Sequence, residues 1–270
     1  MNMETKVVVI TGASSGIGLA CAKKFFQEGF HVVVTGRDDK RLRDAITGMN
    51  NQSNQVLPIV ADVSIEADCK RVMEETINKF GRIDILINNA GISMRALFED
   101  LNLDVIRKVM DTNFWGAVYC TKYALPSILK NKGSVVGVSS IAGKKGLPGR
   151  TGYSSSKFAL EGFLETLRTE NIKKGLHVLV ACPGFTASRI RQTALAADGN
   201  TQGESPRDEQ NMMTAEQVAD EIFIAVKKRK RDLILTFNGK LTVFLNKIIP
   251  AWLDKIVYNH MAKEPDSPFK

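Results

Sequence analysis

A tyrosine and a lysine four positions apart, Tyr153 and Lys157, lie in the stretch TGYSSSKFALEGF at residues 151–163. The stretch has helical periodicity, and side chains at positions i and i+4 share one face of a helix. A phenol can give a proton to a carbonyl oxygen during reduction, or take one from an alcohol during oxidation. The pair is therefore an acid–base candidate, although a tyrosine and a lysine at this spacing are more often ordinary residues of a helix surface.

The pKa of Tyr153 would have to fall for the phenol to act near neutrality, since a free phenol has a pKa of about 10. A unit charge about 4 Å away contributes about 4 kcal/mol at an effective dielectric constant of about 20, and one pKa unit is about 1.4 kcal/mol. Attraction to Lys157 alone could therefore lower the pKa of Tyr153 by up to roughly three units, before desolvation offsets part of it. We expect the lysine to bring the phenol near a working pH.

Short apolar runs alternate with segments of helical periodicity along the whole chain. The strand candidates are 6–11, 31–36, 56–60, 84–87, 134–138, 177–181 and 232–236. The helical segments lie near 17–28, 39–48, 65–80, 102–130, 152–173 and 215–229. Most strand candidates carry consecutive apolar residues, which is typical of strands covered on both faces. The alternation predicts one α/β domain over residues 1–270 with a doubly wound parallel sheet, and ligands beyond the carboxyl ends of its strands.

The first strand and first helix are joined by three glycines, Gly12, Gly16 and Gly18. Glycine lets the backbone approach a phosphate closely, and a helix N-terminus offers unpaired amides and a positive dipole end. The spacing is G-x-x-x-G-x-G rather than G-x-G-x-x-G, but its place after the first strand favours a dinucleotide site. The second strand ends in Gly36, where an acidic residue would favour NAD(H). Arg37 follows, with Asp38 as a helix cap, so we expect NADP(H) to be preferred, with NAD(H) as the alternative.

Seven motifs follow one another along the chain. They are TGASSGIG at 11–18, ADV at 61–63, NNAG at 88–91, the asparagine of DTNFWG at 113, SSIAG at 139–143, YSSSK at 153–157 and PGFT at 183–186. In this order and at these separations they strongly resemble the short-chain dehydrogenase/reductase family, from residue 6 to about residue 236. The resemblance implies a Rossmann-type three-layer α/β sandwich with a mostly seven-stranded parallel sheet. It also implies an NADP(H)-dependent oxidoreductase that interconverts a carbonyl and a secondary alcohol by hydride transfer, with a tyrosine as general acid/base.

The same resemblance implies roles for individual residues. The catalytic tetrad would be Asn113, Ser140, Tyr153 and Lys157. The cofactor would be bound by Gly12, Ser14, Ser15, Gly16, Ile17, Gly18, Arg37, Asp62, Val63, Asn89, Ala90, Gly91, Tyr153, Lys157, Pro183, Gly184, Phe185 and Thr186. Ser140 is chosen over Ser139 because it precedes Tyr153 by thirteen residues, the family's usual separation. By resemblance, Ser140 would orient the substrate oxygen and Asn113 would hold a water for proton relay, while Lys157 would also hydrogen-bond the nicotinamide ribose. The alternative function is a cofactor-binding sensor or scaffold without significant turnover, since a fold does not fix a function.

The substrate pocket of this family is walled by loops after the fourth, fifth and sixth strands. Here these loops contain Ser93 and Met94, Leu147 and Pro148, and the segment 185–213. The long polar stretch at about 186–213 predicts a mobile substrate loop. Its Arg189 and Arg191 could meet an acidic substrate, but solvated arginines are the more common case. The wall as a whole is more apolar than charged, which favours a lipophilic ketone or alcohol as the small-molecule substrate.

The C-terminal stretch at about 240–262 places apolar pairs at 244/245, 248/249, 252/253 and 256/257. This pattern predicts an amphipathic helical extension with a break at Pro250. Three uses compete: covering the pocket, packing across a subunit interface, or lying on a membrane surface beside basic residues. Packing within the protein or against a sister subunit is the simpler interpretation, and peripheral membrane contact is less expected. Because the family commonly assembles through its long fourth and fifth helices, a homodimer or homotetramer is expected by resemblance.

The composition disfavours several other classes of protein. The four cysteines, Cys21, Cys69, Cys120 and Cys182, are far apart, which disfavours a metal site or a disulfide framework and fits a reducing compartment. The net charge is +8 and the run KKRKR occupies 227–231, but no nucleic-acid module accompanies it, so we expect solvated cations at a helix end and no nucleic-acid partner. Neither a signal peptide nor an apolar run of about 18 residues is evident, and a cytoplasmic location is expected.

Overall fold

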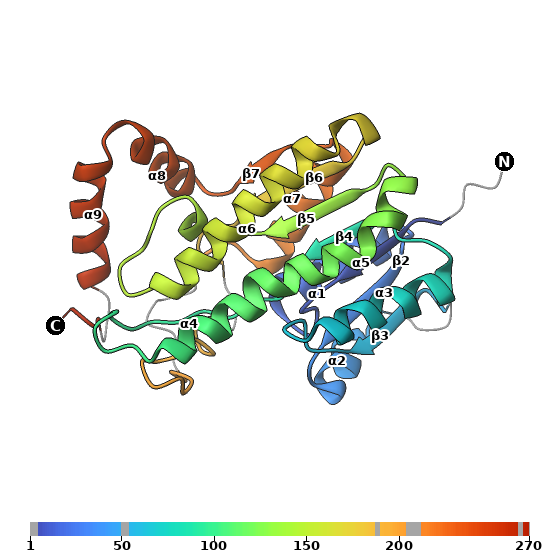
Figure 1. The fold of residues 1–270 in the computed structure, drawn as a ribbon, viewed down its shortest axis with the longest axis horizontal. Helices are drawn as coiled ribbons and strands as arrows, with labels where there is room; N and C mark the ends of the chain where they lie inside the picture. Colours follow the sequence, from blue (N-terminus) through green and yellow to red (C-terminus); the bar gives the residue numbers. More distant parts are fainter. Residues whose placement is uncertain (1–4, 50–53, 187–189, 204–211, 264–266, 270) are drawn as a thin grey trace.

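The computed structural model describes residues 5–49, 54–186, 190–203, 212–263 and 267–269. A sheet of seven parallel strands forms its centre, in the order β3-β2-β1-β4-β5-β6-β7 (Figure 1). The strands are β1 (Val7–Ile10), β2 (His31–Gly36), β3 (Val56–Val60), β4 (Ile85–Asn88), β5 (Ser134–Val138), β6 (His177–Cys182) and β7 (Asp232–Ile234). The direction of winding changes between β1 and β4, so the predicted doubly wound, Rossmann-type sheet is confirmed.

Helices cover both faces of this sheet (Figure 1). They are α1 (Gly16–Gln27), α2 (Asp39–Ile46), α3 (Glu66–Phe80), α4 (Leu103–Met110), α5 (Gly116–Lys130), α6 (Thr151–Glu170), α7 (Ala215–Lys227), α8 (Phe237–Ile248) and α9 (Pro250–Ala262). Short 3-10 turns are η3 (Ile141–Gly143) and η4 (Ile172–Lys174). Side chains alternate across each strand. Val8 and Ile10 accordingly enter the core formed with α1 and α7, whereas Val7 and Val9 enter the core formed with α3, α5 and α6.

A π-helical turn, η2 (Asp111–Trp115), joins α4 to α5 within the helix predicted over 102–130. The i→i+5 pattern of such a turn widens the helix locally and is frequent at functional sites. Asn113 is the one residue of η2 whose side chain is buried. The helix therefore runs through the predicted length, with a local change of pitch at the asparagine that the motif singled out.

The predicted substrate loop is described only in part, because residues 187–189 and 204–211 lie outside the described residues. Within 190–203, Leu195 forms a parallel bridge with Met94, and both side chains are buried in a small core with Val105. This part of the loop therefore packs against the chain that follows β4. The mobility of the whole segment stays a prediction.

The C-terminal extension consists of α8 and α9, which stand beyond the sheet at the left end of Figure 1. Pro250 opens α9, where its missing N–H needs no partner, and α8 ends two residues earlier, so the predicted break of the helix at Pro250 is confirmed. Thr236 caps α8 by accepting a hydrogen bond from the Gly239 amide at 3.1 Å. Among the described residues, no helix combines the length and the apolar character that crossing a membrane requires.

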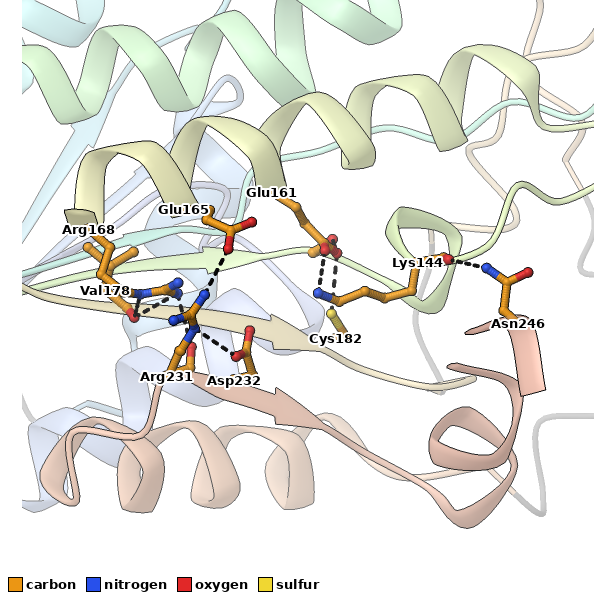
Figure 2. A network of polar contacts seen from close by, with 10 residues as sticks. Lys144, Glu161, Glu165, Arg168, Val178, Cys182, Arg231, Asp232 and Asn246 are labelled. Atoms are coloured by element: carbon orange, nitrogen blue, oxygen red, sulfur yellow. Dashed lines mark hydrogen bonds and ion pairs between the residues drawn. The ribbon is translucent and has the colours of Figure 1, made fainter. Parts of the chain in front are cut away.

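The basic run at 227–231 begins at the last residue of α7, and part of it has structural partners. Arg229 donates to the carbonyl oxygens of Lys132 (3.1 Å) and Gly175 (2.7 Å), which ties three loops together at the amino end of the sheet. Arg231 pairs with Glu165 of α6 at 2.8 Å (Figure 2). All five residues of the run are exposed, as expected of solvated cations at a helix end, and Arg229 and Arg231 also make these contacts.

Candidate active site

A cleft of about 490 Å³ opens at the carboxyl ends of the strands. All the predicted catalytic and cofactor-binding residues line it except Gly18 and Asn113, which lie directly behind its wall. Motifs spread from Gly12 to Thr186 thus converge on one site, because the carboxyl ends of parallel strands meet at one edge of the sheet.

The glycine turn after β1 is held in shape by the asparagine that follows β4. Gly12 has a φ of +64°, and a Cβ there would lie 2.7 Å from the Cα of Ala90, so only glycine fits without strain. Asn89 donates from Nδ2 to the carbonyl oxygens of Thr11 (2.9 Å) and Gly12 (3.0 Å). A Cβ on Gly18 would lie 2.4 Å from that Nδ2. Gly18 therefore acts by leaving room for the Asn89 side chain rather than by facing the cleft.

The N-terminus of α1 faces the cleft with its backbone amides available. The N-cap residue Ser15 makes no side-chain cap hydrogen bond, and the first turn of α1 holds no acidic residue. Ser14, Gly16 and Ile17 line the cleft beside it. Free amides and the positive dipole end attract an anion. These residues fit the diphosphate of a dinucleotide, as the family resemblance implies.

Two arginines lie where the adenosine end of a dinucleotide would bind. Arg37 follows β2, and its Nη1 lies 3.9 Å from Oδ2 of Asp62, with the Arg37 side chain largely in solvent. Asp38 accepts a hydrogen bond from the Arg41 amide at 3.0 Å, so its predicted role as a helix cap is confirmed. Arg41 lines the cleft as well. Sequence reasoning missed it, although its place in the first turn after the predicted second strand was a usable signal.

The catalytic pair shares one face of α6, as its spacing predicts. Nζ of Lys157 lies 5.7 Å from the centroid of the Tyr153 ring and donates to the carbonyl oxygen of Val138 at 2.9 Å. The hydroxyl of Ser140 hydrogen-bonds the phenol of Tyr153. Ser140 is also the N-cap of η3, where its Oγ accepts from the Ala142 amide at 3.2 Å. The end of β5 and the start of α6 thus bring a hydroxyl, a phenol and an ammonium together.

The charge states of the pair differ from the sequence-based expectation. Burial raises the pKa of Tyr153 above its usual value, and the hydrogen bond with Ser140 opposes this only in part. Burial also lowers the pKa of Lys157, from 10.5 to about 8. The prediction that Lys157 alone brings the phenol near a working pH is therefore wrong for the protein by itself. The ammonium does lie over the ring, but burial removes water from both groups. This desolvation disfavours the phenolate of Tyr153 and the ammonium of Lys157 alike.

Asn113 uses its side-chain amide to join two walls of the site. Its Oδ1 accepts from the Ile92 amide at 2.8 Å, and its Nδ2 donates to the carbonyl oxygen of Ile92 and to Oγ of Ser156, both at 2.9 Å. Both amide protons are thereby engaged. A Cβ on Gly91 would lie 3.2 Å from Oδ1, which explains glycine at that position. The side chain therefore positions these segments, and the water-holding role that the resemblance implies for Asn113 stays a prediction.

A buried glutamate, Glu161 of α6, contacts the segment that contains Ser139, Ser140 and η3 (Figure 2). It accepts hydrogen bonds from Ser139 (2.6 Å) and from the thiol of Cys182 (3.4 Å), and it pairs with Nζ of Lys144 at 2.6 Å. Ser139 is therefore turned toward Glu161, and Ser140 is left to face the phenol. Sequence reasoning missed Glu161 because a glutamate within a helix is usually solvated. Its place four residues after the lysine of the catalytic pair was the available signal.

The predicted pocket wall is present in part. Ser93 and Leu147 line the cleft, whereas Met94 is fully buried behind it and Pro148 is not among the described lining residues. Arg150, which sequence reasoning missed, also lines the cleft and donates to Oγ of Ser93 at 2.9 Å.

Arg191 lines the cleft with only 7% of the residue exposed, and its Nη2 donates to the carbonyl oxygen of Thr186 at 2.9 Å. The interpretation of Arg191 as a solvated arginine is therefore wrong, because the described part of the loop folds over its guanidinium. Arg189 lies outside the described residues. All four cysteines are buried and free, and within the part of the chain that the structure describes no group of acidic, His or Cys residues could hold a metal ion.

Comparison with known proteins agrees with this geometry. The family profile described as short chain dehydrogenase matches residues 6–199. The chain belongs to the short-chain dehydrogenase family. Dehydrogenase/reductase SDR family member 7B of Xenopus laevis is 38% identical over 257 residues, which cover 92% of this chain and 80% of that protein.

Two solved structures show the same fold at lower identity. A short chain dehydrogenase/reductase from Burkholderia phymatum in complex with NAD has a TM-score of 0.82 at 23% identity, covering 93% of this chain and 96% of the other. An alcohol dehydrogenase from the archaeon Thermococcus sibiricus, complexed with 5-hydroxy-NADP, has a TM-score of 0.76 at 22% identity, covering 86% and 96%. Membership of the short-chain dehydrogenases makes this protein an oxidoreductase of the dehydrogenase/reductase type that acts on a small molecule.

Proposed function

We propose that this short-chain dehydrogenase is an NADP(H)-dependent oxidoreductase that interconverts a carbonyl and a secondary alcohol, on a lipophilic ketone or alcohol. The observation that carries the proposal is the hydrogen bond between Ser140 and Tyr153, with Lys157 on the same face of α6. The three lie in the cleft that also contains the glycine turn after β1.

The residues of this chain supply the proton and the orientation. When bound, the cofactor would supply or accept the hydride at its nicotinamide ring. Ser140 and Tyr153 both line the cleft with their hydroxyl groups in hydrogen-bond reach of each other, so both would donate to a carbonyl oxygen bound there and stabilise the charge that develops on it. Tyr153 would transfer its proton to that oxygen during reduction and take it back during oxidation. Lys157 would favour the phenolate that the proton transfer leaves, because its ammonium lies over the ring.

The two arginines at the adenosine end support a preference for NADP(H). A 2′-phosphate carries negative charge, and Arg37 and Arg41 both line that end of the cleft. Gly36 occupies the position where a carboxylate would hydrogen-bond the ribose of NAD(H). Asp62 lies nearby, but its Oδ1 already accepts from the amide and hydroxyl of Ser64.

Apolar side chains support a lipophilic substrate. The described lining residues beyond the catalytic group include Ile92, Leu147, Phe185, Ile190 and Leu195. Arg150 and Arg191 lie among them and would confine any polar part of the substrate to one side.

Assembly and location stay predictions. We propose a homodimer or homotetramer that forms through the long helix from α4 to α5 and through α6, which correspond to the predicted fourth and fifth helices. Exposed apolar side chains on both, such as Trp115 and Phe158, support this arrangement. Light scattering during gel filtration would measure the size. The predicted cytoplasmic location would be checked by cell fractionation.

The decisive experiment is a panel of ketones and secondary alcohols, followed at the absorbance band of the reduced nicotinamide with both cofactors. We expect turnover with a higher kcat/KM for NADPH than for NADH. Arg37→Ala should lower kcat/KM for NADPH by about tenfold and leave that for NADH unchanged, since a charged hydrogen bond to phosphate contributes about 1.5 kcal/mol or more. Arg43→Ala is the matched control, because Arg43 pairs with Asp39 outside the cleft. A preference for NADH would contradict the cofactor assignment, and binding without turnover would favour the sensor function.

A further inference from the structure

The helix α8 turns apolar side chains toward solvent. Phe237, Leu241, Phe244 and Ile248 are all exposed, with Phe237 at 78% and Ile248 at 60%. Their spacing of four, three and four residues places them on one face of the helix. A face of this kind normally packs against the protein core, and here the buried residue of α8 is Gly239 instead.

The helix α9 continues the pattern. Trp252 is 55% exposed and Ile256 is also exposed, whereas Leu253 and Met261 are buried. The predicted pair 252/253 is therefore divided between an exposed and a buried side chain, whereas both residues of the pair 248/249 are exposed. We call the exposed set the outer stripe: Phe237, Leu241, Phe244, Ile248, Ile249, Trp252 and Ile256. Packing within its own subunit does not cover these residues, and packing against a sister subunit stays a prediction. Of the described residues, none from α8 or α9 lines the cleft, so covering the pocket does not explain the outer stripe.

Lysines border the outer stripe. Lys240, Lys247 and Lys255 each precede a residue of the stripe by one position, which places them about 100° around the helix and hence at its edge. The sequence from 237 to 263 contains one acidic residue, Asp254, and its carboxylate is paired with Lys145. The surface around the stripe thus combines apolar side chains with lysines. The extension has no further carboxylate between residues 237 and 263 to balance their charge.

We propose that the outer stripe binds the surface of an anionic lipid bilayer. Aromatic and aliphatic side chains would enter the boundary between headgroups and acyl chains, and the lysines would extend to the lipid phosphates. Charge distinguishes this occupant from a second copy of the chain. A symmetric contact through the stripe would bring two sets of lysines together without carboxylates to pair them, whereas an anionic bilayer attracts every one of them.

The extension is fixed to the rim of the active site, so a bound bilayer would lie near the cleft. Nδ2 of Asn246 donates to the carbonyl oxygen of Lys144 at 3.0 Å (Figure 2), and Lys145 pairs with Asp254 of α9. Both lysines follow η3, the turn that Ser140 caps. A lipophilic substrate dissolved in the bilayer would then reach the site over a short distance. The binding itself does not depend on the proposed reaction.

The test is co-sedimentation of the full chain with phosphatidylcholine vesicles that do or do not contain phosphatidylserine. We expect binding to the anionic vesicles that high salt weakens. The double variant Phe244→Glu/Trp252→Glu should lower the affinity by about tenfold or more, because charges on the stripe oppose insertion. Replacing Lys240, Lys247 and Lys255 by Gln should lower it by about a hundredfold. The matched control is Ile172→Glu, a change of an exposed apolar residue of η4, which should bind like the wild type.

Fluorescence gives a second, local measurement, since the chain has two tryptophans. In a Trp115→Phe background the emission comes from Trp252, and we expect a blue shift with anionic vesicles. Retained NADPH binding would show that each variant is folded. The proposal is overturned if the wild type does not bind anionic vesicles, or if the double variant binds them equally well. It is also overturned if the double variant turns a dimer into a monomer in gel filtration, which would assign the stripe to a subunit interface.

Discussion

The ammonium of Lys157 is expected to lose its proton near pH 8 in the folded protein without cofactor. Only 4% of the residue is exposed, and burial lowers its pKa from 10.5 to about 8. In the unfolded chain a lysine keeps a pKa of about 10.4. Between about pH 8 and 10.4 the unfolded chain therefore binds more protons than the folded one, and this residue makes the free energy of unfolding rise with pH.

The shift corresponds to about 3.4 kcal/mol in the free energy of unfolding. This contribution is absent well below pH 8, where the buried ammonium is charged, and is complete by about pH 10.5. About 1.3 kcal/mol of it is gained between pH 7 and pH 9. Other groups also titrate in this range, so the measurement compares the wild type with Lys157→Met. Urea unfolding of both at pH 7 and pH 9, at one protein concentration and without cofactor, gives the two differences in free energy. We expect the wild type to gain about 1.3 kcal/mol on the variant as the pH rises.

The control for this measurement is Lys122→Met, which removes an exposed lysine of α5. Its difference from the wild type should be the same at both pH values, because a lysine in solvent has no burial to relieve. If Lys157→Met and the wild type show the same dependence on pH, the ammonium is not desolvated as the structure indicates. The electrostatic account of the active site would then have to be abandoned.

Three further substitutions test the site. Tyr153→Phe should retain cofactor binding and lower kcat by about a thousandfold, the usual range for loss of a general acid; turnover near the wild-type level would refute the assignment. Gly12→Ala should weaken cofactor binding in calorimetry by about tenfold or more, given the strained φ and the contact with Ala90, which follows β4. Gly29→Ala is its control, with positive φ but nothing within 4 Å. Glu161→Gln should move the alkaline limb of the cofactor-binding pH profile to lower pH, because Glu161 raises the pKa of Lys157; an unchanged profile would contradict this.

The strands and helices could be read from the chain almost to the residue. The periodicity of apolar side chains and runs of β-branched residues indicate secondary structure within a few positions of sequence. For example, β1, β5 and β6 are each buried along their whole length, as their consecutive apolar residues predict. The exception is η2, whose π-helical pitch leaves no periodic signal in so short a stretch.

The residues that form the site were also predictable, because some backbone conformations and close contacts permit only particular residue types. Gly12 must adopt a positive φ beside Ala90, and Gly91 must leave room for Asn113. Only glycine meets these demands, so the residue type at each position marks the site in the sequence. A parallel sheet then brings such motifs to one edge whatever their separation along the chain.

Tertiary structure alone decided how the side chains are charged and which way they face. Arg191 is buried because its own loop folds over it, and Glu161 supports the turn that Ser140 caps because β6 and the end of β5 pack against it. The pKa of Tyr153 rises rather than falls, since the same cleft that brings Lys157 close also removes the water around both. An amphipathic pattern likewise predicts two faces of a helix but not which one meets the protein. The sequence determined the chemistry that could take place, and long-range packing determined its electrostatics and left the outer stripe in solvent.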